Sequence, residues 1–168
     1  MTIPQRKQTP DQQRTEGDTA LRYGANWGVG SARAADARQD LRAFLGHAPR
    51  TGFAPVPTAV AMDAELAASE LVTNAVLHAP GPCGMTLRLS REELTITVWD
   101  SSTDEPAAKQ ADPRRIGGHG LHLVHMVSER VVVALRATGK RITAHLPLAP
   151  HQATSVLGST ALLASSPG

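Results

Sequence analysis

With 168 residues, 41% of them hydrophobic, the chain has enough apolar material for one ordinary core and too little for two independent domains. The 17 basic and 15 acidic residues nearly balance, and the few aromatic residues are not interleaved with a basic run, which argues against direct binding of nucleic acid. No stretch approaches the roughly 20 apolar residues that span a bilayer, and residues 1–19 hold no signal-peptide core, so we expect a cytoplasmic protein without a membrane contact.

The two ends of the chain differ from its middle. Residues 1–20 are polar, and residues 149–168 are rich in serine and other small residues. We therefore expect disordered tails at 1–20 and 149–168 around a folded domain at 21–148. The single cysteine, Cys83, excludes an intramolecular disulfide, and no second thiol supports a metal-binding role for it.

The first half of the domain predicts a strand and two helices. Residues 21–29 are typical of a strand, and residues 32–47 carry apolar side chains at helical spacing. Proline and glycine place a loop at 49–57. Thr58 or Asp63 can then cap a second helix, which a Pro-Gly-Pro run ends.

The second half predicts two hairpins separated by a loop and a helix. Apolar and polar residues alternate over 85–90 and 94–99, which indicates a hairpin with one buried face. A polar loop at 101–118 follows, then a helix at 119–129 and a second hairpin at 130–148. This order predicts an α/β (α+β) two-layer sandwich, with the helices on one face of a mixed, largely antiparallel sheet.

A polar strip runs along the second predicted helix. Glu70, Asn74 and His78 recur every four residues, and because a helix advances roughly 100° per residue, each is turned about 40° from the last. A solvated face would explain the strip equally well, but asparagine is a poor helix former that is more usual at caps and turns. The apolar residues expected to pack on the sheet beside the strip are Leu71, Ala75 and Val76.

This strip has the chemistry of a magnesium–nucleotide site. The carbonyl oxygen of Asn74 is a hard ligand of the kind that Mg²⁺ accepts, together with waters and phosphate oxygens. Glu70, one turn earlier, could orient or deprotonate a nucleophile beside a terminal phosphate. We therefore predict Asn74 as the metal ligand and Glu70 as the catalytic base.

A glycine-rich run, GGHGL, opens the third predicted helix. Glycines let backbone amides approach an anion, and the unpaired N–H groups of a helix start favour phosphate, although a flexible loop before a helix explains the run as well. Arg115, just upstream, could reach the phosphates, while arginines in loops are more commonly solvated. Phosphate contacts are expected from Gly118, His119, Gly120 and Leu121.

Asp100 ends the predicted strand LTITVWD. A carboxylate where a buried strand emerges can accept a hydrogen bond from an exocyclic amine, which distinguishes adenine from guanine. An aspartate that merely turns the chain at a strand end is the alternative.

In this order, ELVTNAVLHA, VWDSS and GGHGLHLV resemble the nucleotide-binding boxes of the GHKL superfamily of gyrase, Hsp90, histidine kinases and MutL, over roughly residues 31–147. Within it, the chain is most similar to the stand-alone anti-sigma-factor serine/threonine kinases. The pattern ExxxNAxxHA carries the resemblance, whereas the glycine box alone is weak. The resemblance implies the Bergerat-type ATP-binding fold, with ATP and Mg²⁺ as cofactors.

The resemblance also implies a role for each matching residue. Asn74 would hold magnesium, Glu70 would act as general base, and His78 would lie near the phosphates or support a lid. Asp100 would contact the adenine amine, and residues 101–118 would form the ATP lid. The phosphate-binding turn would be shaped by Gly118 and Gly120.

In the related anti-sigma kinases, the phosphoryl group goes to a serine of a small antagonist protein, and a free kinase dimer sequesters a sigma factor. The resemblance therefore implies a protein serine/threonine kinase that acts as an anti-sigma factor, with these two proteins as partners and a homodimer left open. The alternative is a non-catalytic ATP-binding module that acts by docking a partner. An ATPase of the gyrase or MutL kind would need transducer domains that 168 residues do not accommodate.

Three features depart from the family pattern. Ser101 and Ser102 replace the glycines expected shortly after Asp100, which changes the expected shape of the adenine pocket. In the last hairpin, relatives often follow Gly-Lys with a threonine that positions the adenine aspartate through water, and here Arg141 takes that position. A phosphoacceptor-histidine domain is also missing before the ATP-binding part, which argues against a sensor histidine kinase.

Overall fold

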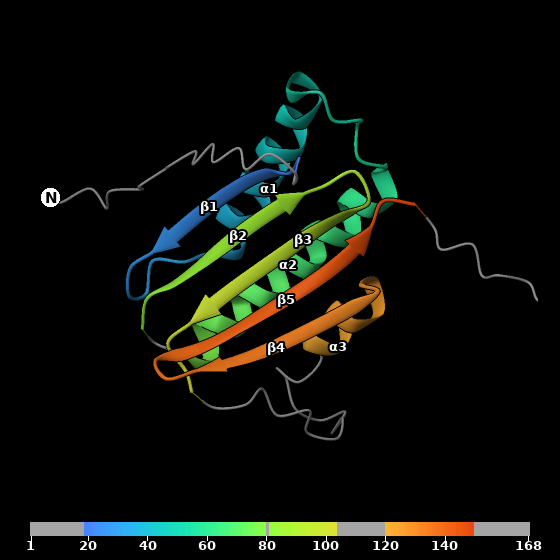
Figure 1. The fold of residues 1–168 in the computed structure, drawn as a ribbon. Helices are drawn as coiled ribbons and strands as arrows, with labels where there is room; N and C mark the ends of the chain where they lie inside the picture. Colours follow the sequence, from blue (N-terminus) through green and yellow to red (C-terminus); the bar gives the residue numbers. More distant parts are fainter. Residues whose placement is uncertain (1–18, 80, 104–119, 150–168) are drawn as a thin grey trace, which may run out of the picture.

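The structure is a computed structural model that describes residues 19–79, 81–103 and 120–149. Its elements, in chain order, are β1 (Leu21–Trp27), α1 (Ala34–His47), the 3-10 helix η1 (Ala48–Thr51), α2 (Thr58–His78), β2 (Cys83–Leu89), β3 (Glu93–Asp100), α3 (Gly120–Val127), β4 (Arg130–Arg136) and β5 (Gly139–Pro147). The strands form one sheet in the order β1-β2-β3-β5-β4, and every pair is antiparallel. Figure 1 shows all three α-helices on one face of this sheet, which confirms the two-layer sandwich.

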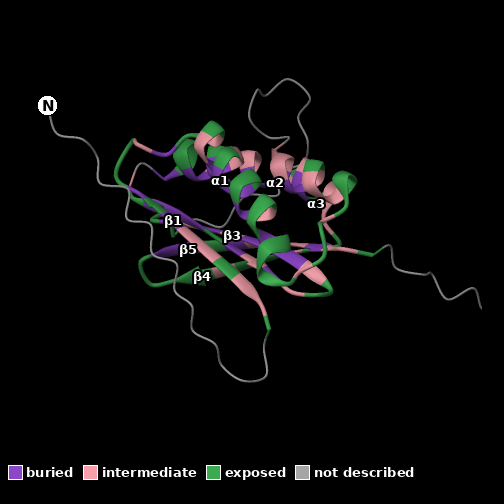
Figure 2. Cartoon of the chain, turned by 90° about the horizontal axis from the view of Figure 1, so that it is seen from above, coloured by how far each residue is buried: buried purple, intermediate pink, exposed green. Residues whose placement is uncertain are grey.

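The core lies between the sheet and the helices, as the burial colours of Figure 2 show. Alternate residues of the strands point toward the helices, and the side chains between them point to the opposite face. The hairpin with one buried face, predicted from alternation, is thereby confirmed. Its fully or nearly fully buried residues on β2, β3 and β5 include Met85, Leu87, Leu89, Leu94, Ile96, Val98, Ile142, Ala144 and Leu146.

The opposite face of the sheet is not covered by any helix among the described residues. There the hydroxyl groups of Thr97 and Thr143 form a hydrogen bond of 3.0 Å across β3 and β5. The indole of Trp99 lies over Gly84, where a Cβ would overlap the indole nitrogen. This face is therefore polar and partly exposed, and the candidate site residues lie on the other side.

Helix α2 packs on the sheet through small side chains. Its buried residues are Ala64, Ala67, Ala68, Leu71, Val72 and Ala75. Val76, expected on this face, is 41% exposed, because it is turned about 100° from Ala75 and leaves the apolar stripe. The expected caps are also wrong: the N-cap is Pro57 without a side-chain hydrogen bond, and the helix begins at Thr58.

Most of the two expected tails and of the expected lid lie outside the described residues, which omit 1–18, 104–119 and 150–168. Of the helices that the structure does describe, none has the length and apolar character needed to cross a membrane.

Candidate functional site

The polar strip of α2 meets the glycine-rich start of α3. A Cβ placed on Gly120 would overlap Oε2 of Glu70 and lie 3.4 Å from its Cδ. The half-buried Glu70 carboxylate thus rests directly on the first residue of α3. Because a helix start carries a partial positive charge, this is a favourable place for a carboxylate. Two predicted site residues that are far apart in the sequence are therefore brought together.

The other two residues of the strip follow along the last turns of α2. Asn74 is half-buried, one turn after Glu70, and His78 is exposed in the final turn. His78 forms no hydrogen bond or ion pair with another described residue. The strip is therefore half-buried at Glu70 and Asn74 and exposed at His78, where α2 ends.

Asp100 and Lys140 form a buried ion pair beside the sheet's end. Both side chains are 3% exposed, and the Lys140 ammonium lies 3.2 Å from Oδ1 and 3.1 Å from Oδ2 of Asp100. The backbone N–H of Ser102 also donates to Oδ1, at 2.8 Å. The carboxylate expected to recognise adenine is therefore held by a cation of the chain itself.

The position of this cation corrects one expectation. Arg141, expected near the adenine aspartate, is exposed and lies opposite Trp99 on the uncovered face of the sheet. Lys140 is the register partner of Asp100. Successive residues of a strand point to opposite faces, so Lys140 and Arg141 cannot both face the helices.

Cys83 is buried next to this pair, at the start of β2. Burial raises the pKa of its thiol, and the negative charge of Asp100 raises it further. The start of β2 and the end of β3 therefore lie close together, at the sheet end near which α2 also ends (Figure 1). The last turn of α2, with His78, lies toward this end, whereas Glu70 and its contact with Gly120 lie at the middle of α2.

The remaining predicted phosphate contacts are described in part. Leu121 is half-buried and packs against the hydrophobic core, so its side chain serves packing while its backbone belongs to the first turn of α3. Arg115, Gly118 and His119 lie outside the described residues.

The donor set on α2 fits a magnesium ion. The described residues contain no group of three or more His, Cys, Asp or Glu side chains that could hold a metal. Magnesium does not need one, since in phosphate sites it takes one or two protein oxygens and completes its shell with phosphates and waters. The amide oxygen of the half-buried Asn74 is an oxygen of that kind.

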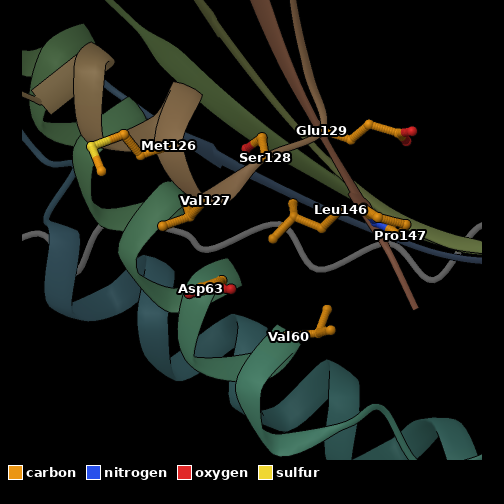
Figure 3. Close-up of a pocket in the computed structure, with 8 residues that line it drawn as sticks. All are labelled: Val60, Asp63, Met126, Val127, Ser128, Glu129, Leu146 and Pro147. Atoms are coloured by element: carbon orange, nitrogen blue, oxygen red, sulfur yellow. The ribbon is translucent and has the colours of Figure 1, made fainter. Parts of the chain in front are cut away.

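A cavity of about 370 Å³ lies at the other end of α3 (Figure 3). Its polar lining includes the carboxylates of Asp63 and Glu129, and no lysine, arginine or histidine is among the described residues that line it. The cavity lies at the end of α3 opposite Gly120, and none of the described candidate site residues lines it. Its other lining residues are Val60, Met126, Val127, Ser128, Leu146 and Pro147.

One family model, described as the histidine kinase-like ATPase domain, matches residues 30–146, a span that contains every site element described above. No curated protein matches the chain.

Proposed function

Because the chain belongs to the histidine kinase-like ATPase domain family, we propose that it is an ATP- and magnesium-dependent protein serine/threonine kinase that acts as an anti-sigma factor. Membership of this family implies ATP binding. The kinase activity and the partner proteins are what we propose in addition. The contact between Glu70 and Gly120 carries the proposal. It puts a half-buried carboxylate at a helix start where phosphates are favoured.

Each residue has a part in this reaction. Asn74 would hold Mg²⁺, which neutralises phosphate charge when bound. Glu70 would accept the proton of the substrate serine as its Oγ bonds to the γ-phosphorus and the bond to the β–γ bridging oxygen breaks, releasing ADP. The first amides of α3 would stabilise the phosphates, and Asp100 would bind the base.

The proposed partners are a sigma factor and a small antagonist protein that carries the acceptor serine. The motif order ELVTNAVLHA, VWDSS, GGHGLHLV, similar to that of the stand-alone anti-sigma kinases, supports them. A cytoplasmic location and a homodimer belong to the same proposal.

Phosphoserine formation tests the kinase proposal. The full chain is incubated with labelled ATP, Mg²⁺ and candidate antagonist proteins, and we expect phosphoserine that Glu70→Gln abolishes. Glu65→Gln is the matched control, because Glu65 lies on the same helix but accepts hydrogen bonds from Arg42, at 2.7 and 2.6 Å. Phosphoserine that survives Glu70→Gln would contradict the assignment of the base.

Binding of the metal is tested separately. Asn74→Ala should remove the magnesium-dependent part of ATP affinity in calorimetry and leave the melting temperature unchanged, since Asn74 is not in the core. Equal ATP affinity of the variant and the wild type would refute the metal site.

The alternative is a non-catalytic module that acts by docking. The ion pair between Asp100 and Lys140 favours it, because the base-binding carboxylate already has a partner. In that case the wild type forms no phosphoserine with any antagonist, and a captured partner binds Glu70→Gln as tightly as the wild type.

A further inference from the structure

The face of the sheet that points away from the helices carries an excess of positive charge (Figure 1). Side chains of a strand alternate between the two faces, so the register fixes which of them point this way. Glu93 is the only carboxylate among them on the described strands, and its Oε2 lies 3.1 Å from Nδ1 of His145. The arginines of this basic face come from β1, β2, β4 and β5: Arg22, Arg88, Arg130, Arg136 and Arg141. An acidic partner is therefore attracted to it.

A row of short side chains crosses the middle of the basic face. Its members are register partners on neighbouring strands, and we call them the threonine row: Gly24, Thr86, Thr97, Thr143 and Val132. Neighbouring strands lie about 4.8 Å apart, so the row is about 19 Å long from β1 to β4. The face is thus low along this row.

Longer side chains, most of them basic, border the threonine row on both sides. One border lies two residues away along the strands and consists of Arg22, Arg88, Thr95, His145 and Arg130. The other border lies two residues away in the opposite direction and consists mainly of Trp99 and Arg141. The borders are thus separated by about 14 Å, at roughly 3.4 Å per residue. An α-helix with its side chains is about 10–12 Å wide, so it fits between them.

We propose that the basic face docks an acidic α-helix of a partner protein, which lies across the strands on the threonine row. About 13 residues of helix match the length of the row, at 1.5 Å per residue. Small side chains of the helix would contact the row, and carboxylates along its two flanks would meet the exposed Arg130 and Arg141. Arginine suits such contacts, because its guanidinium can bind a carboxylate through two hydrogen bonds. Glu70 and Asn74 lie on the other side of the sheet, so this surface is separate from the candidate nucleotide site.

Other anionic surfaces fit the basic face less well. Single strands of nucleic acid stack their bases on several aromatic side chains, and Trp99 is the only aromatic residue that the described strands point to this face. A membrane surface is met by protruding apolar side chains beside the charges, whereas the threonine row is short and mostly polar. A second copy of the chain would bring the same arginines against each other.

Two synthetic peptides of about 14 residues test the proposal. Both are held helical by a side-chain staple and carry alanine along the opposite face; one has glutamates on both flanks of that face, and the other has glutamines there. Fluorescence anisotropy with the full chain at low salt should show the glutamate peptide bound at least about tenfold more tightly, and its affinity should fall as salt is added. Equal affinity for the two peptides, or binding of neither, would overturn the proposal.

A pair of double variants locates the binding surface. Arg130→Gln with Arg141→Gln removes one charge from each border and should weaken the glutamate peptide by about tenfold or more. Arg33→Gln with Arg50→Gln is the matched control, because it removes the same charge from exposed positions at the ends of helices. The control should lose less than about twofold. Equal losses in the two double variants would mean general attraction between charges and would refute the docking surface.

Two further probes decide between kinds of partner. Poly(U) RNA and vesicles that contain phosphatidylserine are titrated with the wild type and with the Arg130, Arg141 double variant. We expect both to bind more weakly than the glutamate peptide. Tighter binding of either one, lost in the double variant, would assign the basic face to that anion and overturn the proposal of a helix. None of these titrations contains nucleotide, so their outcome does not depend on the proposed kinase activity.

Discussion

The carboxylate of Glu70 lies against Gly120 so closely that any side chain at position 120 would displace it. The contact joins the middle of α2 to the first residue of α3. The atom in the way is the far end of a flexible side chain and not backbone, so it can move at little cost to the fold. Stability and phosphoryl transfer should therefore respond differently to substitution here.

We predict that Gly120→Ala changes the free energy of unfolding by less than about 1 kcal/mol. Displacement of the Glu70 carboxylate destabilises the fold, but alanine has a higher helix propensity than glycine, by about 1 kcal/mol, and this offsets the loss. Phosphoryl transfer should fall by about 100-fold, since displacement of a reacting group by about 1 Å has an effect of that size. Urea denaturation and single-turnover assays measure the two effects.

The control for this prediction is Gly46→Ala in α1, where an added Cβ would meet no atom within 4 Å. It should keep full activity. A fully active Gly120→Ala would show that the position of Glu70 does not matter.

A second prediction concerns the buried ion pair. Lys140→Met leaves the Asp100 carboxylate buried without its cation, which should lower the free energy of unfolding by about 3–5 kcal/mol. The double variant Asp100→Asn, Lys140→Met should regain most of it, because the amide keeps the acceptor for Ser102 and carries no charge. Urea denaturation of Asp100→Asn, Lys140→Met and the double variant measures this coupling. If the changes in unfolding free energy of the two single variants add up to that of the double variant, the pair is not coupled.

A third prediction concerns Cys83. Burial, and then the charge of Asp100, raise the pKa of its thiol, and the thiolate is the form that reacts. At pH 8, iodoacetamide should therefore modify the native chain much more slowly than the chain unfolded in urea. Mass spectrometry at timed intervals measures both rates. Equal rates would mean that the start of β2 is open to solvent.

A fourth prediction concerns acid. Hydrogen bonds from Arg42 hold the pKa of Glu65 below its usual value. A lowered folded-state pKa contributes stability above the unfolded-state value of about 4.3, and that stability is lost as pH falls through the folded-state pKa. Over that range the melting temperature of the wild type should fall slightly more than that of Glu65→Gln.

The effect at Glu65 should be small and should shrink at high salt, because the Arg42 side chain is 65% exposed. Parallel curves of melting temperature against pH at low salt would contradict the contribution of this ion pair.

Local periodicity predicted most of the fold. Alternation placed Leu87 and Ile96 on the buried face, and helical spacing placed Leu71 and Ala75 in the core. Val72, which is fully buried, was missed in favour of Val76, because several aliphatic residues in a row do not by themselves show which of them faces the sheet.

The sequence predicted the strip on α2 but not what lies against it. Lys140 could have been found, since its spacing from Ile142 and Ala144 puts it on the buried face of β5. Its pairing with Asp100 depends on β5 lying beside β3, and this strand order comes from tertiary packing. The same holds for Glu70 and Gly120, which neighbouring helices bring together.

The groups of this site come from α2, β3, α3 and β5, and no contiguous piece of the chain carries them all. Ligand affinity and conformational stability are therefore thermodynamically linked: nucleotide at 100 times its dissociation constant would add about 2.7 kcal/mol to the unfolding free energy. A substitution deep in the core, for instance at the fully buried Val124 of α3, can thus lower apparent affinity without touching the ligand. Activity lost in a variant can be assigned to the chemistry of this site when its melting curve is known as well.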